Sequence, residues 1–167
     1  MIEDSALVNA VAPFLHLVTD PVPKRLDTYW WPVTDNRITT FRIRACFCRS
    51  LPAFYKEISA ALQFPIGFGN NIHALEDCLG DLDWIRGNSI AVVVWDASEF
   101  LVDETADLAT SVLCAIERAC VEQSNPVNAG WPSNQPARAL HFLFVLRGHE
   151  VPAFSQHMGG PHWADPS

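Results

Sequence analysis

Two side chains that could do chemistry, His73 and Asp77, stand four positions apart near the middle of the sequence. On a helix this spacing places an imidazole and a carboxylate on one face, where they could ligate a metal ion or act as a general base and its orienting partner. No third group joins them, and no phosphate-binding glycine loop, zinc-protease motif or nucleophile elbow is present. The pattern favours an exposed polar pair, and we expect neither enzymatic activity nor a cofactor.

The helix that would carry this pair is predicted over residues 71–82. At about 100° per residue, its residues divide into two opposite faces. The apolar face, suited to a core, carries Ile72, Leu75, Leu79 and Leu82. The polar face carries His73, Glu76, Asp77 and Gly80. A turn over residues 64–69, with one proline and two glycines, separates this helix from an earlier one over residues 51–62.

The neighbouring segments predict strands that alternate with helices. Residues 38–48 alternate apolar and polar side chains, whereas 89–96 and 139–146 are continuous apolar runs, as expected for strands covered on both faces. This alternation predicts an α/β fold with a three-stranded parallel sheet flanked by helices. We expect an irregular N-terminal extension over 1–37, a domain over 38–147 and a mobile tail over 148–167.

The acidic residues are concentrated in one part of the chain. The net charge is −8, and residues 51–110 hold ten acidic residues against two basic ones, Lys56 and Arg86. Such a field repels nucleic acid and attracts a basic protein surface. The simpler interpretation, that these charges serve only solubility, stays open at this point.

The cysteines and the hydropathy indicate a cytoplasmic location. Five cysteines are an odd number, they show no paired metal-ligand spacing, and no positively charged leader precedes the first apolar stretch. We therefore expect reduced thiols without a disulfide. No segment approaches the roughly 20 apolar residues that a membrane-spanning helix requires, so we expect no membrane partner.

The run from Phe64 to Leu79 resembles the central motif of the barstar family. The matching positions are Pro65, Phe68, Gly69, Asn71, Ala74, Leu75, Asp77, Cys78 and Leu79. The order of the predicted elements over residues 38–147 is similar as well. Two positions depart from the family pattern: His73 stands where the family has an aspartate, and Gly67 where it often has an aromatic residue.

The resemblance implies an inhibitor or immunity protein that binds and blocks the active site of a basic ribonuclease, in which carboxylates take the place of RNA phosphates. Asp77 would be the main anchor. The full set of expected partner-binding residues is Phe68, Gly69, Asn70, Asn71, His73, Glu76, Asp77 and Gly80. Two alternatives stay open: a non-inhibitory binding module with another basic partner, and a metal-assisted hydrolase that uses His73 and Asp77.

Overall fold

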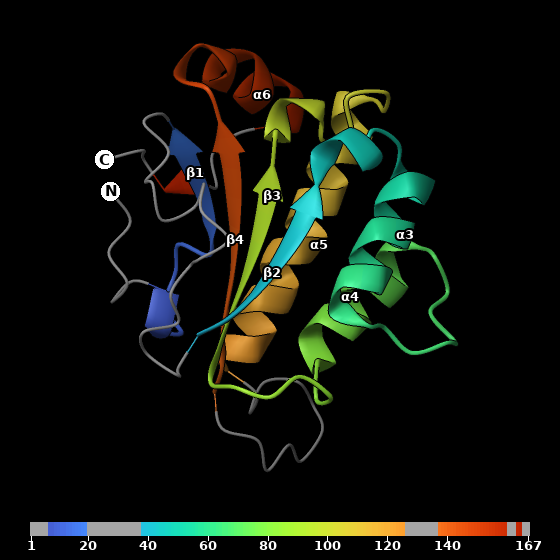
Figure 1. Cartoon of the computed structure of the whole chain (residues 1–167), viewed down its shortest axis with the longest axis vertical. Coiled ribbons are helices and arrows are strands. Elements are labelled where there is room, and N and C mark those ends of the chain that lie inside the picture. The colour runs from blue at the N-terminus through green and yellow to red at the C-terminus, as the bar shows by residue number, and fades with distance from the viewer. Residues whose placement is uncertain (1–6, 20–37, 126–136, 160–162, 165–167) are drawn as a thin grey trace.

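A parallel β-sheet organises the computed structural model, which describes residues 7–19, 38–125, 137–159 and 163–164 (Figure 1). Its strands pair in the order β2-β3-β4-β1-β5, and every pair is parallel. The strands are β1 (Leu15–Thr19), β2 (Ile38–Arg44), β3 (Ser89–Trp95), β4 (Ala139–Leu146) and β5 (Trp163–Ala164). The helices are α3 (Leu51–Leu62), α4 (Ile72–Asp81), α5 (Ala106–Ser124) and α6 (Val151–Met158).

The predicted fold class, an α/β fold with a parallel sheet flanked by helices, is confirmed, but the predicted number of three strands is wrong. β1 lies within the segment for which irregular structure was expected, and it pairs with β4 so that Leu15 is opposite Phe142. Four of its five residues are buried. Pro13 disfavours a helix just before this segment, and a strand buries the segment between β4 and β5.

The end of the chain also differs from the expectation of a mobile tail, because residues 148–159 are folded. A short 3-10 helix, Gly148–Glu150, leads into α6, which buries Phe154 and Met158 against the main core. Gly159, with φ of 78°, ends the helix in the left-handed conformation that suits glycine. The domain boundaries at 38 and 147 stay a prediction.

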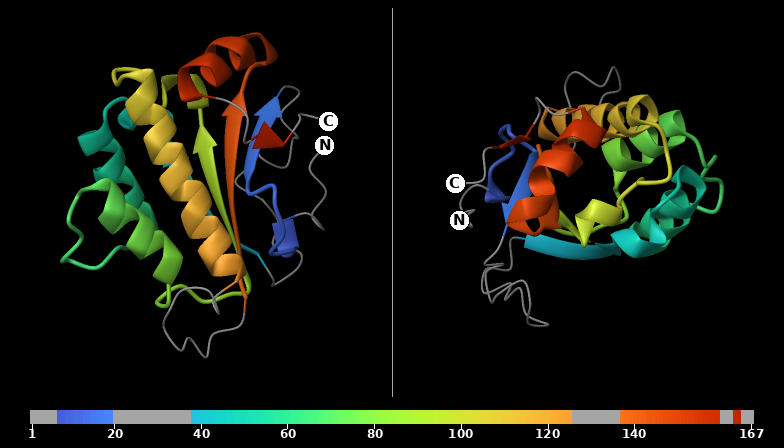
Figure 2. Two further views of the ribbon diagram at one scale, coloured as in Figure 1. Left: turned by 180° about the vertical axis from the view of Figure 1, so that it is seen from behind. Right: turned by 90° about the horizontal axis from the view of Figure 1, so that it is seen from above.

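The two faces of the sheet are covered differently. The larger core lies between the sheet and the helices, which gather on one side of it (Figure 2). Alternate residues of β4 point to opposite faces: Phe142 and Phe144 enter this larger core, while Leu143 and Val145 enter a smaller cluster on the other face. This two-sided burial explains why β4, apart from His141, is apolar throughout rather than alternating.

The five cysteines are all free thiols, which confirms the expectation of no disulfide. Cys48 and Cys120 are buried, and burial raises the pKa of both thiols. Within the described part of the chain, no helix is both long and apolar enough to cross a membrane.

Candidate partner-binding site

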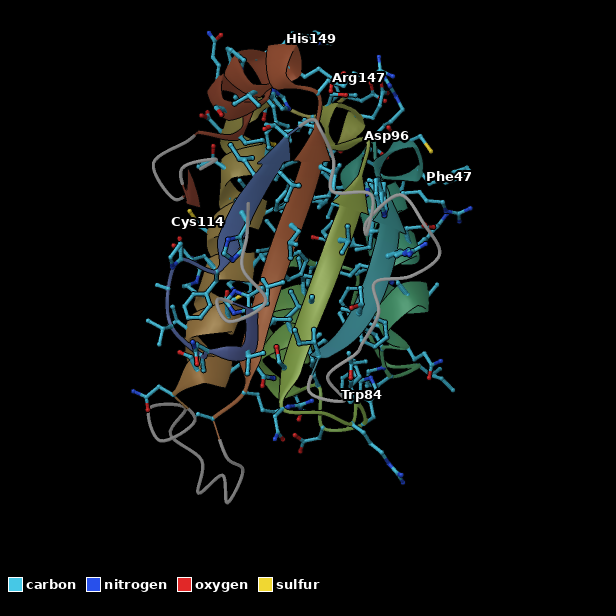
Figure 3. All side chains as sticks on the ribbon, turned by 60° about the vertical axis from the view of Figure 1, so that its left-hand side comes forward. Phe47, Trp84, Asp96, Cys114, Arg147 and His149 are labelled. Carbon is cyan, nitrogen blue, oxygen red and sulfur yellow. The ribbon has the colours of Figure 1, made fainter. Side chains whose placement is uncertain are left out.

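A row of aromatic side chains fixes the loop that leads into α4. The Phe68 ring makes edge contacts with Tyr55 of α3 and with Phe64, at centroid distances of 5.6 Å and 5.0 Å. Phe64 contacts Trp84, whose indole nitrogen donates to the Leu62 carbonyl oxygen at 2.7 Å. Asp96 and Arg147 directly follow β3 and β4 at one end of the sheet, and Trp84 lies at the opposite end (Figure 3). Phe68 is therefore an anchor of the loop.

Asparagine side chains then set the start of α4. Asn71 is the N-cap, and its side-chain oxygen accepts from the Ala74 backbone N–H at 2.9 Å. Its amide nitrogen donates to the Gly69 carbonyl oxygen at 3.2 Å. A Cβ atom at Gly69 would come within 2.9 Å of this amide nitrogen, so glycine leaves room for the cap. Asn70 is exposed, with φ of 49°.

The predicted division of α4 into two faces is confirmed for most of its residues. Leu75 and Leu79 are buried in the main core, as is the C-cap Leu82. His73 and Asp77 are exposed on the outer side of the same helix. Loss of either polar side chain therefore removes no core contact.

Glu76 is already paired within the chain, which the sequence did not reveal. Its two carboxylate oxygens accept from Nε and Nη2 of Arg118 on α5, both at 2.7 Å. The hydrogen bond from Arg118 lowers the pKa of Glu76. This carboxylate therefore joins α4 to α5. Its role in partner binding stays a prediction.

Gly80 lies against the same helix α5. A Cβ atom there would come within 2.6 Å of Oε2 of Glu122, so the missing side chain makes room for that carboxylate. The pKa of Glu122 is raised by partial burial and by the nearby charges of Glu76 and Asp77. Glu122 thus adds a second carboxylate close to Asp77. Its position was not predicted because it comes from a different helix.

Two further residues hold the C-terminal end of α4 in place. The amide nitrogen of Gln123 lies 3.1, 2.8 and 2.9 Å from the carbonyl oxygens of Leu79, Gly80 and Asp81. The buried guanidinium of Arg138 donates to the next carbonyls, at 3.0 Å for Leu82, 2.7 Å for Ile85 and 3.2 Å for Gly87. These bonds supply donors to carbonyl groups that a helix end leaves without partners.

Replacing Arg138 with methionine is expected to destabilise the protein by about 2 kcal/mol, because three carbonyl oxygens lose their charged donor while the apolar packing is kept. Urea unfolding of both proteins measures this difference. Arg86, which is exposed, is the matched control: Arg86→Met should stay within about 0.5 kcal/mol of the wild type. Equal unfolding midpoints for the two variants would contradict the structural role of Arg138.

The structure therefore separates the predicted site residues into two groups. Gly69, Asn70, Asn71, His73 and Asp77 are exposed on the loop and α4. The others, Phe68, Glu76 and Gly80, are partly buried against neighbouring parts of the chain. Among the described residues, no cluster of three or more His, Cys, Asp or Glu side chains is placed to hold a metal ion. Within the exposed group, Asp77 offers a carboxylate to a cationic partner.

Comparison with known proteins agrees with this arrangement. Among curated proteins, no relative matches the sequence. A family model described as "Barstar (barnase inhibitor)" matches residues 38–130, which is more than half of the chain. The matched range runs from the start of β2 beyond the end of α5, and so contains the aromatic loop, α4 and the ion pair between Glu76 and Arg118. On this match, the chain belongs to the barstar family.

Proposed function

We propose that this protein is an inhibitor of a basic ribonuclease, and that it blocks the enzyme's active site with the loop over residues 64–71 and with α4. Asp77 is the main anchor and occupies the place of an RNA phosphate. In this proposal the ribonuclease is a toxin, and this chain is the immunity protein that protects a cell from that toxin. The protein itself catalyses no reaction in this proposal.

The observation that carries the proposal is the family match, which includes the exposed loop and helix. Asp77 is exposed there, and among the described residues no cation pairs with its carboxylate. An exposed carboxylate with no cation among these residues is available to a guanidinium or ammonium group of a partner. Removing one partner of a desolvated charge pair of this kind weakens binding strongly.

The charge distribution supports a fast encounter with such an enzyme. Residues 51–110, which include α4, hold ten acidic residues and only Lys56 and Arg86 as basic ones. A field of one sign steers an oppositely charged partner and loses strength as salt screens it. Because His73 and Gly67 depart from the family pattern, we expect the cognate enzyme to differ from barnase in the details of its site.

The test uses the purified full chain as a bait for ribonucleases from its own cells, with barnase assayed in parallel. Cleavage of a fluorescent RNA should stop at one equivalent of the protein, and the association rate should fall steeply as ionic strength rises. A captured basic protein that is bound but still cleaves RNA would indicate the non-inhibitory binding module instead. RNA cleavage by the protein alone with divalent metals would support the hydrolase.

A further inference from the structure

Ile66 is an apolar side chain without any cover. Its exposed fraction is 108%, the highest of the large apolar side chains in the described residues. The next, Val11, reaches 68%. Single exposed apolar residues are common on protein surfaces, so exposure alone assigns no role to Ile66. A role for Ile66 is indicated instead by the way its backbone is held.

The turn that carries Ile66 is fixed in the free protein. The Phe68 backbone N–H donates to the Pro65 carbonyl oxygen at 2.9 Å and closes a turn with Ile66 and Gly67 at its tip. Phe68 in turn packs by its edge against Tyr55 and Phe64. A side chain that is presented on a fixed turn loses little conformational entropy when a partner covers it.

The space around the tip is open. A Cβ atom added at Gly67 would find no atom within 4 Å, so no neighbouring group covers this side of the turn. The turn leads directly into the N-cap Asn71 and the exposed polar side of α4. Ile66 therefore stands on the same loop and helix that the proposed function places against a ribonuclease.

We propose that Ile66 is an apolar anchor that inserts into an apolar pocket of the partner, next to the basic groups that Asp77 contacts. This inference rests on the proposed function and adds a second requirement to the partner: its cationic site must border an apolar recess large enough for a branched side chain. Asp77 supplies charge recognition, and Ile66 supplies shape recognition. Ile66→Gly would keep the charge pattern but remove the side chain that fills the recess.

The expected effect follows from the area that binding would cover. Complete burial of an aliphatic side chain corresponds to about a 10- to 100-fold change in affinity. Ile66→Ser should lower the affinity by this factor, while Ile66→Leu should retain most of it. Because apolar burial is not a charge interaction, the loss in Ile66→Ser should be the same at low and high salt, in contrast to that in Asp77→Ala.

The experiment measures dissociation constants for barnase and for the ribonuclease captured as bait partner, at two salt concentrations. The control is Val11→Ser, which also exchanges an exposed branched residue for serine, on the segment before β1. Thermal unfolding should show unchanged stability for both variants, since neither side chain is buried.

The outcomes separate this inference from the proposed function. A salt-independent loss in Ile66→Ser, absent in Val11→Ser, supports the anchor. If Asp77→Ala weakens binding while Ile66→Ser binds within twofold of the wild type, the anchor is refuted and the inhibitor function stands. If the wild type binds neither ribonuclease, both proposals fail together.

Discussion

Asp77→Ala should weaken binding to the cognate ribonuclease by about 2–5 kcal/mol and leave folding stability within about 0.5 kcal/mol of the wild type. The binding loss is expected because the partner's cations would be left desolvated without their counter-charge. The small change in stability is expected because the carboxylate is exposed on α4, away from Leu75 and Leu79. Inhibition titrations and urea unfolding measure the two quantities separately.

Asp107→Ala is the matched control for this variant, since it also removes one negative charge. Asp107 is exposed in the first turn of α5, about 17 Å along that helix from Arg118. Its loss should change the association rate slightly through the overall field and leave the dissociation rate unaffected. Equal losses of affinity in the two variants would mean that only net charge matters, and an unfolded Asp77→Ala protein would show that the site was misplaced.

The second large effect concerns acid. Two buried histidines, His16 of β1 and His141 of β4, lie with Nε2 and Nδ1 at 3.1 Å. The other nitrogen of His141 is 3.1 Å from the carbonyl oxygen of Asn9, which can only accept, so this nitrogen carries the proton. In the neutral pair, His16 therefore donates to His141. Protonation of His141 at Nδ1 would remove the acceptor and place a charge in a buried site.

Burial, together with the neighbouring His141, lowers the pKa of His16 from 6.5 to about 4. Burial also lowers the pKa of His141, against the opposing effect of the carbonyl groups of Asn9 and Pro13. The unfolded chain thus takes up protons at higher pH than the native protein. The neutral pair makes its whole contribution to the free energy of unfolding above about pH 6.5, and this contribution is lost as the pH falls toward 4. His16 alone accounts for about 3 kcal/mol of that loss.

Urea unfolding at steps from pH 7 to pH 4 measures this loss. In His16→Gln, whose amide can still donate to His141, the loss of unfolding free energy over this range should be smaller by about 3 kcal/mol. His149→Gln replaces an exposed histidine and should retain the wild-type dependence. Carboxylates titrate in all three proteins and cancel in the comparison. Parallel curves for His16→Gln and wild type would contradict the role of the pair.

Local patterns along the chain were sufficient for much of this fold. The apolar run over 139–146 coincides with β4, and the alternating faces predicted for 71–82 match the buried and exposed residues of α4. The motif around Asp77 and Cys78 was enough to indicate the family that the comparison found. These features depend on neighbours within a few positions, which hydrophobic periodicity reports directly.

Contacts between distant segments could not be predicted in this way. Glu76 lies on the same predicted polar face as His73 and Asp77. Only the position of Arg118 on α5 shows that the Glu76 carboxylate is paired. Gln123 lies on α5 and Arg138 directly precedes β4, so their bonds to carbonyl oxygens at the end of α4 depend on how these three elements pack together. The sequence did not predict β1, because its five residues show no strict alternation of apolar and polar side chains and its strand partner β4 comes much later in the sequence.

The position of β1 in the sheet also governs the order in which the protein can assemble during synthesis. β1 leaves the ribosome before β2 and β3, yet its two neighbours, β4 and β5, both follow them. His16 and His141 are 125 positions apart, so a nascent chain holds one member of the pair long before the other exists. β2, β3 and the helices between them can form early, whereas β1 must wait, and pairing over such a separation is intrinsically slow. The growing chain consequently carries β1 without a strand partner until β4 emerges.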